Sequence, residues 1–122
     1  MAIRARSRDA LIVDLRKWLL SGQTIVYQST LDSFILNDNA FFAANWCIVC
    51  VGEAAGQILK HYPDFPNEEL RKELLFANAT RNRIAHGYYD LNIEQVWKTI
   101  ADSFSMLSAM LEKYLIELNH EF

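Results

Sequence analysis

The residues best able to do chemistry gather in one short stretch, Arg81 to Tyr88. Histidine titrates near neutral pH and can act as general base or general acid. The arginine guanidinium presents a fixed fork of donors that suits phosphate oxygens and the charge that develops during phosphoryl transfer. Asn82 stands four residues before His86, so its amide shares a helical face with the imidazole. This set of side chains predicts chemistry on a phosphate group.

Helical geometry adds a condition to this prediction. Arg81 and His86 are five residues apart, which is about 140° around an ideal helix. One helix therefore brings the two side chains together poorly, and a second copy of the stretch facing it across a dimer would help. The alternative interpretation is a helix end at which the guanidinium and the imidazole only cap free carbonyl groups.

The other candidate residues point to structural roles. Cys47 and Cys50 have the spacing of a redox CxxC pair, but a zinc site would need a second such pair, which the sequence lacks. They stand among apolar residues in a helical pattern, so we expect core thiols. His61 falls at a helix end, where it can cap carbonyls. The three histidines have no metal-ligand spacing and the sequence has no phosphate loop, so we predict no metal and no cofactor.

Glu53 is a carboxylate inside the most apolar stretch of the chain. An isolated buried charge is costly, so this side chain must be paired or must face a pocket. A structural ion pair with an arginine and a supporting role in the site are both open.

The sequence predicts an all-α antiparallel bundle of four to five helices. It has four glycines and two prolines, and both prolines fall between residues 63 and 66, which leaves long uninterrupted stretches. Gly22 interrupts or weakens the first helical pattern. The expected helices cover about residues 10–20, 40–61, 68–85 and 93–118, with a short helical turn near 31–35.

Two of these patterns bear on the site. The stretch 40–61 is apolar nearly all round, as in a helix at the centre of a bundle or in a subunit interface. The face of the next helix begins with Leu70 and Leu74 and ends with Arg81, Asn82 and His86. We expect that face to be buried at its start and to open into a polar pocket at its end. The last pattern repeats apolar residues every three or four positions, as a packed helical seam does.

Length, composition and charge limit the number of domains, the ligands and the location that we expect. A chain of 122 residues with 52% hydrophobic residues is expected to form one domain, covering residues 1–122. The net charge is −3, so nucleic acid would have to be held by a local patch rather than by bulk charge. No secretory signal is evident, and the apolar stretch is broken by polar residues, so we expect a cytoplasmic protein with no membrane span.

The motif residues resemble those of a known family, the HepT-type HEPN toxins. Arg81, His86 and Tyr88 match its R-x4-H-x-Y motif, and the likeness continues to Trp97. A second block is similar to the family's GEAA helix. That block comprises Val51, Gly52, Glu53, Ala54 and Ala55.

The resemblance implies a homodimeric helical bundle whose two motifs face one cleft. It implies metal-independent RNA cleavage with His86 as acid and base, Arg81 on the phosphate and Asn82 assisting. It also implies a minimal nucleotidyltransferase antitoxin that silences the toxin by adenylylating Tyr88. Two rival hypotheses are a non-catalytic helical subunit that presents substrate to a partner nucleotidyltransferase, and a purely structural bundle.

Overall fold

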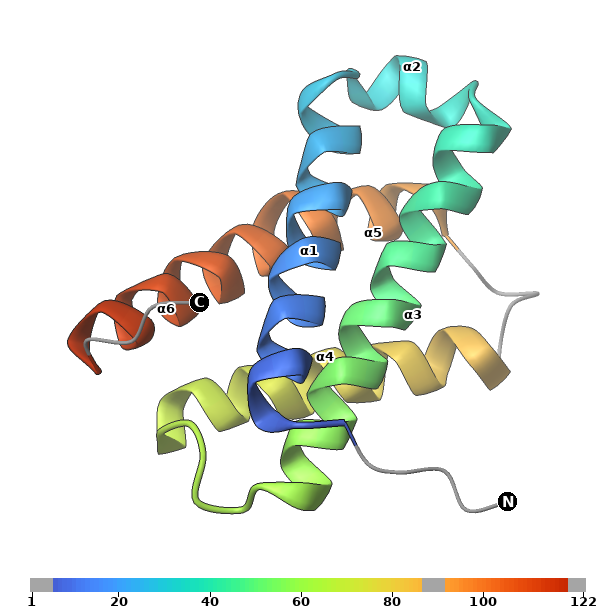
Figure 1. Ribbon diagram of the computed structural model, residues 1–122. Coiled ribbons are helices and arrows are strands. Elements are labelled where there is room, and N and C mark those ends of the chain that lie inside the picture. Colours follow the sequence, from blue (N-terminus) through green and yellow to red (C-terminus); the bar gives the residue numbers. More distant parts are fainter. Residues whose placement is uncertain (1–5, 87–91, 119–122) are drawn as a thin grey trace.

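The computed structural model describes residues 6–86 and 92–118, and every regular element in these ranges is helical. Helices α1 and α3 lie side by side and run in opposite directions, and α4 and the α5–α6 stretch cross behind them (Figure 1). This confirms the predicted all-α bundle. The elements are α1 (Arg8–Tyr27), α2 (Leu31–Ile35), α3 (Asp38–His61), α4 (Glu68–His86), α5 (Ile93–Lys98), the π-helical segment η2 (Thr99–Phe104) and α6 (Ser105–Glu117).

Polar side chains fix the helix starts. Each cap accepts the backbone N–H of the residue three positions further on, which satisfies one of the free donors of the first turn. Replacing such a cap by alanine typically costs about 1 kcal/mol. The cap residues are Ser7, Thr30, Asn37, Asn67 and Asn92, all of them among the capping candidates in the sequence.

The expected interruption at Gly22 is wrong, because α1 continues without a break to Tyr27. The glycine has a packing role instead. A Cβ atom at position 22 would lie 2.6 Å from Cε2 of Phe104, so its absence lets the Phe104 ring seat directly on the α1 backbone.

The last helical pattern also differs from the expected regular seam. Residues 99–104 form a π-helical turn between α5 and α6, a rare element that occurs mostly as a single turn within an α-helix. Ile100 and Phe104 are both buried within it, and the burial continues through Leu111. The buried face of α6 ends with Leu115, whereas Leu118 is 41% exposed.

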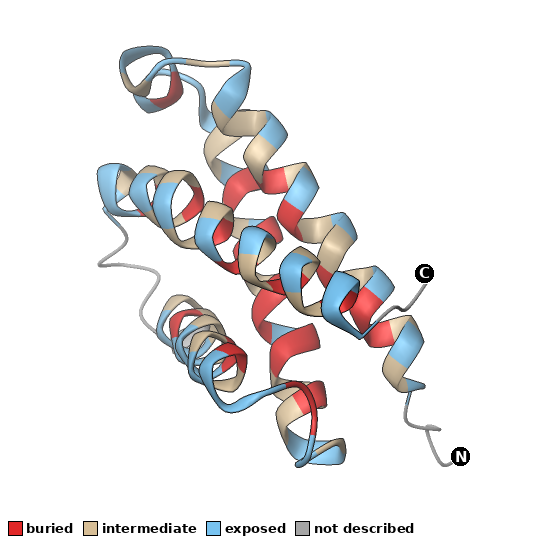
Figure 2. Ribbon diagram, turned by 90° about the vertical axis from the view of Figure 1, so that its left-hand side faces the viewer, coloured by how far each residue is buried: buried red, intermediate tan, exposed pale blue. Residues whose placement is uncertain are grey.

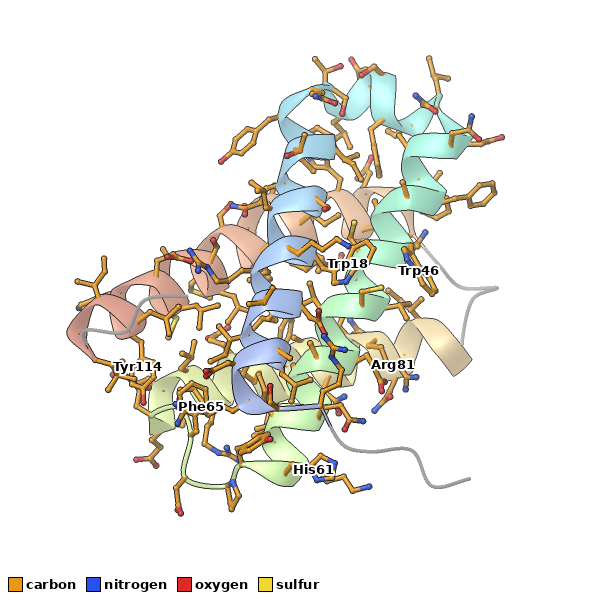
Figure 3. The ribbon with its side chains drawn as sticks, in the orientation of Figure 1. Trp18, Trp46, His61, Phe65, Arg81 and Tyr114 are labelled. Atoms are coloured by element: carbon orange, nitrogen blue, oxygen red, sulfur yellow. The ribbon has the colours of Figure 1, made fainter. Side chains whose placement is uncertain are left out.

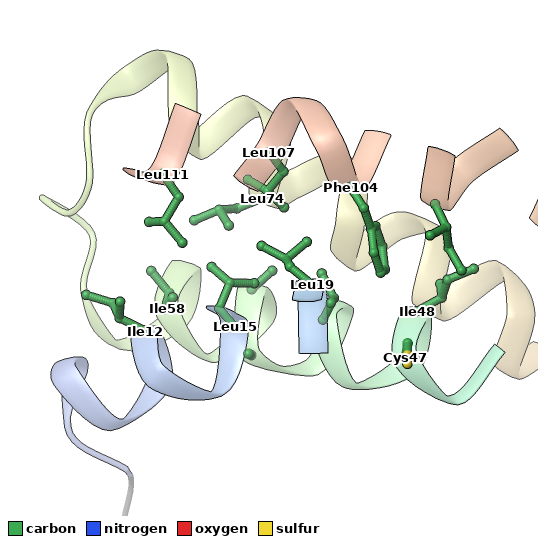
Figure 4. Packing of buried hydrophobic residues seen from close by; sticks show 14 of the residues in the cluster. Ile12, Leu15, Leu19, Cys47, Ile48, Ile58, Leu74, Phe104, Leu107 and Leu111 are labelled. Carbon is green, nitrogen blue, oxygen red and sulfur yellow. The ribbon is translucent and has the colours of Figure 1, made fainter. Parts of the chain in front are cut away.

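Helix α3 occupies the middle of the core, as its composition predicted. It is the one helix of the described ranges that is long and apolar enough to span a bilayer, but its apolar residues pack against α1 and α4 (Figures 2 and 4). The buried residues of this helix are Ala44, Cys47, Ile48, Val51, Gly52, Ala54, Ala55 and Ile58. It therefore serves as the scaffold on which α4 carries the candidate site.

Candidate active site at the crossing of α3 and α4

The contact between α3 and α4 is close at Gly52. A Cβ atom there would lie 2.2 Å from Cβ of Arg81 and 2.8 Å from the carbonyl oxygen of Ala77, so no larger residue fits unless α4 moves. The Asn78 side chain donates from Nδ2 to the Gly52 carbonyl at 3.0 Å, which holds the two helices in register. This contact determines where the Arg81 side chain begins.

Two polar side chains hold the Arg81 guanidinium. Nη2 lies 3.5 Å from Oε2 of Glu53, and Nη1 donates to Oδ1 of Asn82 at 2.9 Å. Nε is buried and has no hydrogen-bond partner among the described residues. Glu53 is paired with an arginine and also faces the groove, but the expectation that its charge is buried is wrong, because its side chain is 54% exposed. The long separation of the ion pair leaves the guanidinium with unused bonding capacity.

Arg81 and Glu53 lie at the wall of a groove of about 890 Å³ that follows α3. The side chain of Arg81 is 33% exposed, so the guanidinium is accessible from this groove. Trp18 and Trp46 lie together at one end, while His61 lies at the far end of α3 (Figure 3). A groove of this volume is large enough to take a nucleotide-sized ligand. Arg81 is the residue of α4 that lines this groove, so a pocket at the end of the α4 face that includes Asn82 and His86 stays a prediction.

The structure brings together three of the five predicted site residues, Glu53, Arg81 and Asn82. His86 is the last residue of α4, but its side chain lies outside the described residues, and so does Tyr88. Asn82 bonds to Arg81, so in this arrangement it positions the guanidinium. The relation of Arg81 to the imidazole stays a prediction.

The two cysteines have the character of core thiols. Cys47 is 3% exposed, and burial, reinforced by the nearby Cys50, raises its pKa to about 11. Burial also raises the pKa of Cys50, which lies partly exposed on the groove. Neither thiol is activated as a nucleophile, because reactivity requires a lowered pKa. In the parts of the chain that the structure describes, no group of three His, Cys, Asp or Glu side chains could hold a metal ion.

The prediction that His61 caps the end of α3 is wrong, because Arg71 of α4 performs this role. Its Nη2 donates to the Leu59 carbonyl at 3.2 Å, and its Nη1 donates to the carbonyls of Tyr62 and Phe65. The signal for this residue in the sequence is weak: it is a basic side chain just inside a helix that follows a proline-containing loop.

The protein is all-helical in the described ranges, and its site gathers Arg81, Glu53 and Asn82 beside a groove. Helix α4, which carries Arg81, ends at His86. The family model of the HepT-like ribonucleases matches residues 21–114, which is most of the chain. The chain belongs to this family, as its motif residues suggested. No curated protein and no solved structure matches it.

Proposed function

We propose that this protein is the toxin ribonuclease of a HEPN–nucleotidyltransferase toxin–antitoxin pair and that it cuts RNA without a metal ion. Membership in the HepT-like ribonuclease family supports RNA as the substrate. The observation that carries the proposal is Arg81, whose side chain is 33% exposed at a groove and whose ion pair with Glu53 is loose at 3.5 Å. A guanidinium in this state can accept a phosphate group.

The proposed reaction is an internal transesterification. His86 removes the proton from a ribose 2′-hydroxyl, whose oxygen attacks the adjacent phosphorus atom. The bond from phosphorus to the 5′-oxygen of the next nucleotide breaks, and that oxygen takes a proton from imidazolium. Arg81 stabilises the additional negative charge on the phosphate oxygens, and Asn82 keeps the guanidinium oriented. The products are a 2′,3′-cyclic phosphate and a 5′-hydroxyl.

The site is proposed to be composite, with two copies of the chain facing one another. The five-residue spacing of Arg81 and His86 separates them by about 140° on α4, so a second α4 supplies the missing group in each half. Exposed aromatic residues on α3, of which Trp46 lines the Arg81 groove, support an interface, because exposed apolar patches mark association surfaces. Phe42 is 64% exposed and Trp46 is 58% exposed, one helical turn apart on α3.

Silencing is proposed to occur at Tyr88. A partner nucleotidyltransferase would transfer an adenylyl group to the phenol oxygen, two residues from His86. The added phosphate would place a negative charge and a bulky nucleoside where the RNA phosphate must bind. We place this pair in the cytoplasm.

The proposal is tested with the purified chain in EDTA, after intact-mass measurement has shown that no adenylyl group is present. Wild type is expected to cut RNA and to leave cyclic-phosphate ends, whereas Arg81→Ala and His86→Ala should each lose cleavage while remaining folded dimers. Arg83→Ala is the matched control, since Arg83 is an exposed arginine of the same helix. Cleavage that persists in both site variants would refute the proposal. A folded wild-type dimer that cuts nothing would favour the non-catalytic presenting subunit.

A further inference from the structure

A second hollow adjoins the Arg81 groove at the end of α3. It measures about 410 Å³, and its lining includes Arg8, His61, Tyr62, Phe65 and Tyr114. His61 also lines the groove that contains Arg81. The two depressions share this residue in their linings, so they lie next to each other on the surface.

Three side chains in the hollow form a stack. The ring of Phe65 lies 5.6 Å from the ring of Tyr114, edge to face. The Arg8 guanidinium lies over the Phe65 ring, with Cζ 4.7 Å from the ring centroid. The Arg8 side chain is 37% exposed, and its one ion-pair contact among the described residues is a long one of 3.8 Å to Asp9. The guanidinium is therefore the accessible layer of a stack that is already formed.

The loop beneath this stack is fixed by hydrogen bonds. Arg71 binds the carbonyls of Tyr62 and Phe65 from below, and the Tyr62 hydroxyl donates to the Arg6 carbonyl at 3.0 Å. Phe65 is only 7% exposed, so it acts as the floor of the hollow. A ligand would meet this surface without having to order it first, which reduces the entropy lost on binding.

Charge in the two depressions favours an anionic ligand. Arg6 is paired with Asp14 at 2.8 Å, and Arg81 with Glu53 at 3.5 Å. Lys60, an exposed residue that lines the Arg81 groove beside His61, has no carboxylate within 4.0 Å in the described part of the chain. The linings of the two depressions together carry four basic side chains, Arg6, Arg8, Lys60 and Arg81, against three acidic ones, Asp14, Glu53 and Asp64.

We propose that the Arg8 stack, formed by Arg8, Phe65 and Tyr114, binds an unpaired base of the RNA substrate. This inference rests on the proposed function. Bases of single-stranded RNA stack on arginine guanidinium planes and aromatic rings, while cations follow the backbone. Lys60 and His61 contact the phosphates between that base and the reacting phosphate at Arg81. Glu53 and His61 are eight residues apart on α3, about 12 Å along the axis, so the bound base lies a few nucleotides from the cleavage point.

The test measures binding of fluorescent single-stranded RNA whose riboses are all 2′-O-methylated, since this RNA has no hydroxyl that can attack. Arg8→Gln is expected to weaken binding about ten-fold, in line with the loss of one stacked base. Arg8→Lys keeps the positive charge but lacks the planar guanidinium on which a base can stack, so it should lose most of this affinity as well. Lys98→Gln, which removes an exposed cation that lines neither depression, should bind as wild type does. Thermal unfolding of each variant checks that the fold is retained.

A crosslink locates the base independently of affinity. The same RNA carrying 5-iodouracil should crosslink on irradiation to Tyr62 or Tyr114. Unchanged affinity in Arg8→Gln, crosslinks confined to other residues, or a wild type that binds no RNA would each overturn the inference. Tight, Arg8-dependent binding without cleavage of unmodified RNA would leave the inference standing and remove the proposed nuclease function.

Discussion

Arg71 and Arg81 stand ten residues apart on α4, and both are partly buried, yet their surroundings differ. Arg71 donates to three backbone carbonyls, those of Leu59, Tyr62 and Phe65. Arg81 contacts two side chains, Glu53 at 3.5 Å and Asn82 at 2.9 Å, and its Nε has no hydrogen-bond partner within residues 6–86 and 92–118. The two arginines therefore differ in what they contact, backbone carbonyls or side chains, and not in how far they are buried.

The difference has a physical basis. Backbone carbonyls at a helix end cannot move away, and without a donor they remain unsatisfied. Arg71 is therefore committed to the fold. Side-chain partners such as Glu53 can rotate, and a half-exposed ion pair contributes little to stability. A substrate phosphate can replace such partners at Arg81 without disturbing the backbone.

The largest effect on stability is expected from Arg71→Gln. This change leaves the carbonyls at the end of α3 and in the following loop without their donor, and it should lower the free energy of unfolding by about 2–4 kcal/mol. Urea unfolding followed by circular dichroism measures it. The neighbouring exposed Lys72→Gln is the control and should change stability by less than about 0.5 kcal/mol. A loss no larger than that of Lys72→Gln would remove the structural role assigned to Arg71.

Gly52→Ala should have an intermediate effect on stability and a strong effect on activity. The added methyl group would meet Cβ of Arg81 and the Ala77 carbonyl at 2.2 and 2.8 Å, so α4 must move. Overpacking of this kind costs about 1–3 kcal/mol, and RNA cleavage should fall at least ten-fold, because a small misplacement of a catalytic group lowers the rate strongly.

The control for this change is Gly56→Ala. Its methyl group would first meet the Asn78 amide at 2.4 Å and displace its hydrogen bond to the Gly52 carbonyl. Because this is the end of a side chain and the α4 backbone need not move, the loss should be smaller. Urea unfolding and a cleavage assay on the same samples compare the two. A greater loss in Gly56→Ala than in Gly52→Ala would contradict the close contact described for Arg81.

The smallest effect on stability is expected from Glu53→Gln, which keeps the side-chain volume but removes the charge opposite Arg81. The Glu53 side chain is 54% exposed, so the free energy of unfolding should change by less than about 1 kcal/mol. Cleavage should fall several-fold, because the guanidinium loses one of the groups that orient it. Asp14→Asn, which breaks the Arg6 ion pair in the same groove, should leave cleavage nearly unchanged. Equal activity losses in the two variants would show that Glu53 has no special relation to Arg81.

Much of the fold could be predicted from local patterns. Asn37, Asn67 and Asn92 are caps by residue type and position, and the apolar composition of α3 indicated its central place. Gly22 and the π-helical turn at residues 99–104 could not be predicted this way, because both depend on contact between α1 and the last helix. A glycine that breaks an isolated helix is tolerated where a neighbouring ring needs the space.

Some features of the site could likewise be predicted from the sequence, and others could not. The spacing of Arg81, Asn82 and His86 and the presence of Glu53 could be read from the sequence, since they follow from residue type and helical period. The Glu53–Arg81 pair required knowledge of how α3 crosses α4. The role of Arg71 and the Arg8 stack depended on the path of the loop after α3, which no periodic pattern describes.

The most direct test compares Arg81→Gln with Arg71→Gln for unfolding free energy and for RNA cleavage in EDTA. Arg81→Gln should change stability by less than about 1 kcal/mol and should reduce cleavage by about 100-fold or more, the loss typical of a donor that stabilises transition-state charge. Arg71→Gln should lower the free energy of unfolding more than Arg81→Gln does. The Arg71→Gln molecules that remain folded should still cut RNA. An Arg81→Gln protein that cuts RNA as fast as wild type, or that fails to fold, would contradict the functional role assigned to Arg81.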